Sequence, residues 1–202
     1  MKKVILAALF AGFVVGATAE EAKTFSVSAG PFIGVTAGGD IEESDLAYGG
    51  QVQVSIAEVY LVELAVSTFS DSYDGDNIET DQDTTSIGFS VGARAAVASK
   101  CGVYGLFGPN YNTSEADIDV DQDKAPGASA KIDFDDSVGF HAAVGATYEV
   151  SSRVSFFVEY RYTFLDLDAE ASLVRTDGST DQDDGDFSYD FGIAKAGLNV
   201  TF

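Results

Sequence analysis

The sequence predicts an all-β protein, an eight-stranded, antiparallel, up-and-down transmembrane β-barrel. Three observations lead to this prediction. Apolar and polar residues alternate along most of the chain, short and long connections follow one another in turn, and 27 of the 33 acidic residues lie in or beside the long connections. A period of two is the pattern of a β-strand whose two faces meet different surroundings.

The first nineteen residues have the pattern of an export signal. Lys2 and Lys3 precede an apolar run at 4–16, and the small residues at 17–19 offer a cleavage site. The run is shorter than the roughly 20 residues that a membrane-spanning helix needs. We therefore expect residues 1–19 to be a cleaved signal peptide and residues 20–202 to form one barrel domain with four long acidic loops.

Eight segments carry the strand pattern. In the first, Phe25, Val27 and Val35 fall on one face, whereas Ser26 and Thr36 fall on the other. The expected strands are 25–37, 46–56, 60–69, 85–97, 103–111, 138–150, 154–165 and 187–202. Most of them are long enough to cross a bilayer at a tilt, which takes about 9–11 residues.

The connections alternate in length. Short turns are expected at 57–59, 99–102 and 151–153, and long loops at 38–45, 71–83, 112–136 and 166–186. All long loops therefore leave the strands at one end. Short turns at one end and long loops at the other are the layout of a transmembrane β-barrel.

The two faces of the strands decide between a membrane barrel and a soluble periplasmic barrel. One face carries Val, Ile, Leu, Phe and Tyr, and the other is rich in Gly, Ser and Gln. Small residues suit a narrow lumen and bulky apolar ones suit lipid, so the pattern favours the membrane. Aromatic residues near the strand ends suggest interfacial girdles, with Tyr60, Tyr148 and Phe202 at one rim and Phe69, Phe164 and Tyr189 nearer the other.

Charged residues within the strands all fall on the polar face. They are three acids and three bases, accompanied by the single histidine: Glu63, Arg94, Glu149, Glu159, Arg161, Lys195 and His141. Because an unpaired charge in a dry interior is costly, we expect a lumenal ion-pair network that plugs the barrel. The alternative is that these residues line an ion path.

The last strand ends on an aromatic residue, with apolar residues at every second position before it. The positions are Ala194, Ala196, Leu198, Val200 and Phe202. This strand resembles the final strand of bacterial outer-membrane proteins, and the layout is most similar to small OmpA/OmpX-type or opacity-type eight-stranded barrels. The resemblance implies a place in the outer membrane of a Gram-negative-type bacterium, contact with its lipid, and recognition of the last strand by the barrel assembly machinery.

Composition limits the chemistry that the chain can perform. One Cys allows no internal disulfide, and one His allows no polyhistidine metal site. A formal net charge of −22 makes nucleic acid a poor partner. Ala143 stands where the serine of a His-x-Ser motif would follow His141, so we expect no enzyme and no cofactor.

The acidic loops contain weak candidates for calcium ligands at Asp117, Asp119, Asp121 and Asp123. An EF-hand loop needs Gly at its sixth position, and Gln122 or Lys124 stands there instead. Divalent cations are therefore possible partners of these loops, and a merely solvated surface is the alternative. The sequence as a whole predicts a structural or surface-interaction role, adhesin-like, through the loops. A narrow cation-preferring channel is the alternative function.

Overall fold

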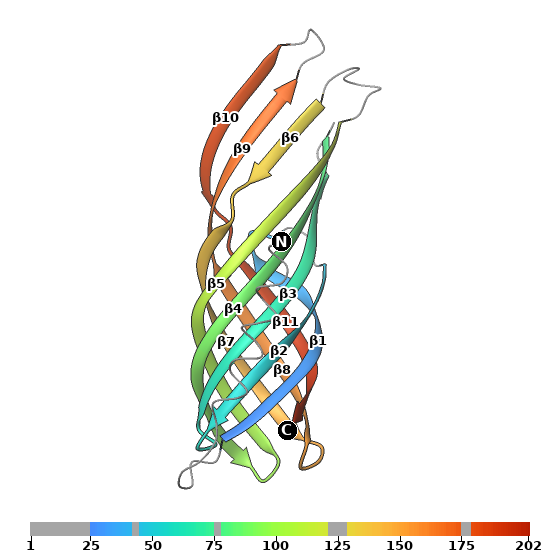
Figure 1. Ribbon diagram of the computed structural model, residues 1–202. Coiled ribbons are helices and arrows are strands. Elements are labelled where there is room, and N and C mark those ends of the chain that lie inside the picture. The colour runs from blue at the N-terminus through green and yellow to red at the C-terminus, as the bar shows by residue number, and fades with distance from the viewer. Residues whose placement is uncertain (1–24, 42–44, 75–77, 121–128, 175–178) are drawn as a thin grey trace.

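A computed structural model of the chain describes residues 25–41, 45–74, 78–120, 129–174 and 179–202. The predicted signal peptide lies outside these residues. Eight strands form a closed antiparallel barrel in the order β1-β11-β8-β7-β5-β4-β3-β2, which confirms the predicted fold class (Figure 1). No helix in the described part of the chain is long and apolar enough to span a membrane.

Most of the barrel strands run further toward the loop end than predicted, but the strand at 46–56 has the predicted bounds, and those predicted at 154–165 and 187–202 are shorter at that end. Their bounds are β1 Phe25–Gly39, β2 Leu46–Ile56, β3 Tyr60–Asp74, β4 Ile78–Ala98, β5 Cys101–Val120, β7 Ser137–Glu149, β8 Val154–Phe164 and β11 Phe191–Thr201. The first and last strands pair in antiparallel register, with Ser28 opposite Thr201 and Val35 opposite Ala194. This seam leaves the barrel without an open edge, as a spanning structure requires.

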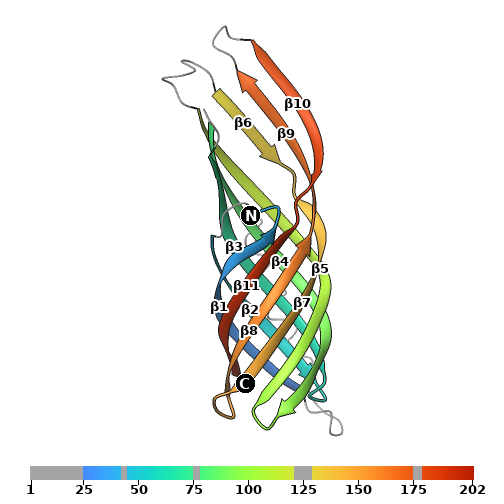
Figure 2. The same cartoon turned by 180° about the vertical axis from the view of Figure 1, so that it is seen from behind.

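Many residues of the predicted long loops lie in strands. Three further strands, β6 Ser129–Phe134, β9 Asp166–Val174 and β10 Thr180–Ser188, form a separate sheet in the order β10-β9-β6. We call it the outer sheet, because it stands beyond the barrel on the side away from the short turns (Figures 1 and 2). β4 and β5 also continue beyond the barrel wall, where Asp81 pairs with Asp117 and Asp83 pairs with Glu115.

The wall is apolar on the outside and polar on the inside. Val138, Phe140 and Val144 on β7 are 65–69% exposed, whereas Glu63 and Ser90 are at most 1% exposed. A soluble protein would bury the first group and solvate the second. The predicted orientation of the two faces is therefore confirmed.

The lumen holds bulky side chains as well as small ones. Phe32, Leu61, Phe69, Phe157 and Phe191 are all buried on the inner side. Some inward-facing glycines make room for rings. A Cβ on Gly145 would lie 2.3 Å from the ring of Tyr104, and one on Gly197 would lie 2.7 Å from the ring of Phe157. An eight-stranded barrel is just wide enough to be filled in this way.

The turn between β2 and β3 is tight and uses an uncommon backbone conformation. Ala57 and Glu58 have φ angles of 53° and 61°. Two consecutive residues with positive φ are the signature of a type I′ hairpin turn, which glycine and asparagine adopt more readily than Ala or Glu. The turn thus carries strain that the flanking strands offset.

Candidate functional site

Four of the seven predicted lumenal residues meet in one cluster. Glu63 comes from β3, Glu159 and Arg161 from β8, and Lys195 from β11, where Lys195 is the register partner of Glu159. Arg161 forms ion pairs with Glu63 and, at 2.9 Å, with Glu159. Lys195 Nζ lies 3.0 Å from Glu159 Oε1. We call these four residues the ion-pair cluster, and its formal charge is balanced.

Neutral side chains complete the hydrogen bonding of the carboxylates. Tyr104 donates its hydroxyl to Glu159 Oε2 at 2.9 Å, and Gln53 donates its amide to Glu63 Oε2 at 3.3 Å. Every carboxylate oxygen of the cluster therefore has a donor. Full satisfaction is what allows charges to persist in a low-dielectric interior.

Aromatic rings surround the cationic end of the cluster. The Lys195 ammonium lies 4.2 Å from the centroid of the Phe32 ring and 5.9 Å from that of Phe157. Its Nζ also donates to Gln51 Oε1 at 3.3 Å. The Lys195 side chain is 2% exposed and both carboxylate side chains are 0% exposed. In this packing, the cluster crosses the lumen and joins three strands of the wall.

The other three predicted residues are not members of the cluster, although the ring of His141 lies beside Arg161: a Cβ on Gly88 would be 3.0 Å from His141 Cε1 and 3.2 Å from Arg161 Nη1. Arg94 is half-buried on β4, Glu149 is exposed at the end of β7, and neither forms an ion pair with another described residue. His141 is buried, and its Nε2 lies 2.7 Å from the hydroxyl of Ser90. The sequence analysis missed this serine, which stands 51 positions away in the chain.

The Ser90 and His141 pair is not a catalytic triad. The Nδ1 atom of His141 has no hydrogen-bond partner among the described residues, so no carboxylate orients the ring. Ser90 is 0% exposed, which leaves no room for a substrate at its hydroxyl. Nucleophilic catalysis needs an accessible nucleophile and a positioned base, and this pair supplies only a contact.

A second group of buried side chains fills the lumen at the mouth of the barrel, and the sequence analysis did not predict it. We call it the outer apolar cluster, and its buried members are Ala47, Phe69, Leu165, Leu167, Tyr189, Phe191 and Ile193. The rings of Phe69 and Phe191 lie 4.8 Å apart. Phe69 and Tyr189 are at most 7% exposed, so their assignment to an aromatic girdle was wrong. Tyr60, Tyr148, Phe164 and Phe202 are exposed, as the girdle requires.

Polar contacts fix the outer apolar cluster to the strand ends. Tyr189, between β10 and β11, donates to Asp71 Oδ2 at 2.8 Å. Burial, and then the nearby Asp71 carboxylate, raise the pKa of the Tyr189 phenol. Asp190 accepts a hydrogen bond from the backbone N–H of Leu165 at 3.2 Å. The chain segments that lead to the outer sheet are thus tied to the barrel mouth.

The remaining candidates are placed as follows. Asp117 and Asp119 lie on β5, whereas Asp121 and Asp123 fall outside the described residues. No group of three or more metal-ligating side chains occurs in the part of the chain that the structure describes. The residues of the proposed assembly signal lie on β11, except for Phe202, which directly follows it. Leu198, Val200 and Phe202 are exposed, and Ala194 and Ala196 are half-buried.

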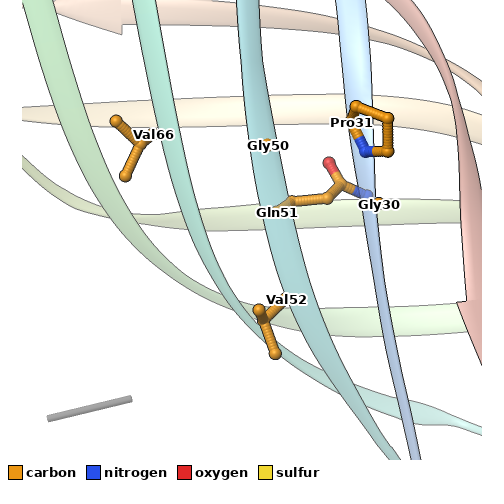
Figure 3. Close-up of a pocket in the computed structure, with 6 residues that line it drawn as sticks. All are labelled: Gly30, Pro31, Gly50, Gln51, Val52 and Val66. Carbon is orange, nitrogen blue, oxygen red and sulfur yellow. The ribbon is translucent and has the colours of Figure 1, made fainter. Parts of the chain in front are cut away.

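An open pocket of about 350 Å³ lies on β1, β2 and β3. It is lined by Gly30, Pro31, Gly50, Gln51, Val52 and Val66, and Gly50 forms its floor between Pro31 and Val66 (Figure 3). The residues that face out of the wall here are apolar. The pocket is therefore a notch in the lipid-facing surface rather than a site for chemistry.

Comparison with known proteins agrees with this geometry. The family model of the outer membrane protein beta-barrel domain matches residues 5–202. The chain belongs to this family. Members are outer-membrane barrels, so the protein is an outer-membrane protein of a Gram-negative-type bacterium. No curated protein matches the sequence.

Solved structures of outer-membrane barrels share the fold at low sequence identity. The outer membrane protein OprG from Pseudomonas aeruginosa has 19% identity and a TM-score of 0.64, covering 91% of this chain and 98% of its own. Neisserial surface protein A has 18% identity and a TM-score of 0.59, with 90% and 100% covered. Ail, the attachment invasion locus protein of Yersinia pestis, has 11% identity and a TM-score of 0.51, with 90% and 100% covered. At these identities the likeness shows the fold alone.

Proposed function

We propose that this outer membrane protein β-barrel is closed to solutes and serves a structural or surface-interaction role through its outer sheet. The observation that carries the proposal is the ion-pair cluster, which is charge-balanced and almost completely buried, and in which every carboxylate oxygen has a donor. The outer apolar cluster supports it, because it fills the barrel mouth with side chains. A lumen filled at two levels favours a plug over a pore.

Surface display follows from the direction of the long strands. In barrels of this type short turns face the periplasm and long extensions face outward. The outer sheet and the outer halves of β3, β4 and β5 would then stand in the extracellular medium, where a partner can reach them. The similar structures include a protein named for attachment and invasion, Ail, and this agrees with an adhesin-like role.

Biogenesis and chemistry complete the proposal. The signal peptide would be removed after residue 19, and the outward-facing residues of β11 would be read by the barrel assembly machinery. The protein would have no catalytic activity, since its single histidine contacts a buried serine and, within the described ranges, forms no hydrogen bond to a carboxylate.

Planar-bilayer recording tests the closed lumen. The purified, refolded wild-type barrel should stay silent. Steady conductance of the wild type, with cation selectivity, would contradict the plug and establish the second candidate, a narrow cation-preferring channel. That candidate is favoured by the acidic residues at the outer end, which would concentrate cations at a mouth.

Epitope insertion tests the surface role. A short tag inserted at 175–178, beyond β9, should be detected by antibody on intact cells. The matched control carries the same tag at 151–153, in the short turn before β8, and should be detected only after the cells are lysed. The opposite pattern would overturn the orientation on which the surface role depends.

A further inference from the structure

The outer sheet has one open edge. Its strand order is β10-β9-β6, so β9 lies in the middle and the other two strands lie at the edges. The β6 side is next to β5, whereas β10 is paired with β9 alone among the strands that the structure describes. Both views place β10 at the margin of the molecule, with no strand beyond it (Figures 1 and 2). The β10 side is therefore accessible to another chain.

The backbone of β10 is regular along this edge. The strand has nine residues and pairs with β9 without a register shift, from Thr180 opposite Val174 to Ser188 opposite Asp166. Successive residues of an antiparallel strand direct their N–H and C=O groups to alternate sides. Roughly half of the backbone groups of β10 thus point away from β9, and such a row is a template for a further strand.

The sequence of β10 protects this edge by charge alone. Proteins commonly blunt an edge strand with proline, lysine or a bulge, or by making it very short. The stretch 180–188 contains no proline, lysine or arginine, but it contains four aspartates, Asp181, Asp183, Asp184 and Asp186. Four like charges repel an acidic strand, including β10 of a second copy, and they favour a strand that carries basic residues.

The register adds further acidic residues beside this edge. Asp133 of β6, Glu170 of β9 and Asp184 of β10 are successive partners in one cross-strand row, and Asp168 of β9 is opposite Asp186 of β10. Like charges that are directly opposite destabilise a sheet, and opposite charges stabilise it. A lysine or arginine in a strand beyond β10 would stand next to Asp184 or Asp186 and would offset this repulsion.

From these observations we propose that the edge of β10 binds an extended cationic segment of a partner protein, which adds to the outer sheet as a fourth strand. Backbone hydrogen bonds supply the binding, and the aspartates select basic residues over acidic ones. The inference rests on the proposed surface role, because the partner must reach the outer sheet from the extracellular side.

A fluorescent peptide of alternating lysine and threonine, as long as β10, tests the edge on the full-length barrel refolded in detergent. Fluorescence anisotropy should show saturable binding, and hydrogen exchange of the β10 backbone amides should slow when the peptide is bound. The control peptide has the same sequence with every backbone nitrogen methylated, so it keeps its charges but donates no backbone hydrogen bond. Equal binding of the two peptides would show mere attraction of a polycation and would overturn the proposal.

Charge variants of the barrel test the selection. Asp184→Asn combined with Asp186→Asn should weaken binding of the lysine peptide by about two- to thirtyfold, the range expected for two cross-strand charge pairs. The matched control is Asp81→Asn combined with Asp83→Asn, because these aspartates lie on β4, which is paired with β3 on one side and β5 on the other. The control should leave the affinity unchanged. An equal loss in both double variants would contradict a site at β10.

Light scattering of the wild-type barrel without peptide tests the other occupant, a second copy of this chain. Association of barrels that competes with the peptide would make the second copy the occupant and would overturn the cationic partner. The binding assays do not depend on orientation in the membrane, so they separate this inference from the surface role. No peptide binding, with a tag at 175–178 detected on intact cells, would reject the edge site alone. Peptide binding with a hidden tag would support the edge site and reject the surface role.

Discussion

Neutralising one carboxylate of the ion-pair cluster, by Glu63→Gln, is expected to destabilise the barrel strongly. The substitution keeps the shape of the side chain but leaves Arg161 and Lys195 to share Glu159 alone. Both carboxylates have side chains that are 0% exposed, so the excess positive charge cannot be hydrated. Breaking a buried ion pair in this way costs about 3–5 kcal/mol, against about 0–1 kcal/mol for an exposed pair.

The measurement is the free energy of unfolding in urea, with the barrel in detergent micelles. Glu149→Gln is the matched control, because Glu149 is a strand carboxylate of the same face that is exposed and outside the cluster. It should change the free energy of unfolding by no more than about 0.5 kcal/mol. If Glu63→Gln fell within the same small range, the cluster would not be the buried, coupled unit that we describe.

A charge-balanced double variant separates the cost of imbalance from the loss of contacts. Glu63→Gln combined with Arg161→Gln removes one charge of each sign and leaves the 3.0 Å pair of Glu159 and Lys195. Coupled neighbours deviate from additivity by about 0.5–3 kcal/mol. The double variant should therefore be more stable than the sum of the two single effects predicts. Strict additivity would show that the two residues act independently.

Three further predictions concern other parts of the molecule. Replacing Ala57 and Glu58 with Asn-Gly should stabilise the barrel by about 1 kcal/mol in the same urea assay, because it relieves the positive φ angles, and a loss of stability would count against the assigned turn. Gly145→Ala should destabilise by about 1–3 kcal/mol, since its Cβ would overlap the ring of Tyr104, and an unchanged midpoint would show that the ring moves freely. Raising the ionic strength from about 10 mM to about 150 mM shortens the Debye length from roughly 30 Å to roughly 8 Å. Screening should weaken the repulsion between the acidic residues that face one another in the outer halves of β4 and β5. Hydrogen exchange of the backbone amides should therefore slow there and not in the barrel. Equal slowing in both regions would show that screening of these residues is not the cause.

The alternation of residue types was sufficient to predict the barrel and the buried, inner position of Glu63, Glu159, Arg161 and Lys195. Successive residues of each strand face the lipid and the lumen in turn, so the alternation can be read from neighbouring residues alone. The pairing of Glu159 with Lys195 could not be predicted, since it depends on how β8 and β11 are aligned across a long insertion. The contact of Ser90 with His141 depends likewise on the folded cross-section and not on neighbours in the chain.

The outer strands were missed because their acidic composition is typical of loops. The signal was nevertheless present: Glu79, Asp81 and Asp83 alternate with other residues, as do Glu115 and Asp117 across the same ribbon. In this ribbon the acidic composition suggests loops and the period of two indicates strands, and the structure agrees with the period.

The outer apolar cluster was missed for a different reason. Phe69 has the same parity as Glu63 on β3, so alternation alone places its ring inside. Its position as an aromatic residue near a strand end suggested an interfacial girdle instead. Whether a ring fits inside a narrow barrel depends on residues across the lumen, which no local pattern reports.

The junctions between the barrel and the outer sheet give the molecule an uneven tolerance to sequence change. Leu165 and Leu167 stand where β8 passes into β9, and Tyr189 stands where β10 passes into β11, and all three are packed in the barrel mouth. The hairpin beyond these residues can change in length, or in the number and sign of its charged residues, without disturbing that packing. In a population under immune or phage pressure, substitutions should accumulate in the tips of β9 and β10 and should stop abruptly at these three anchors.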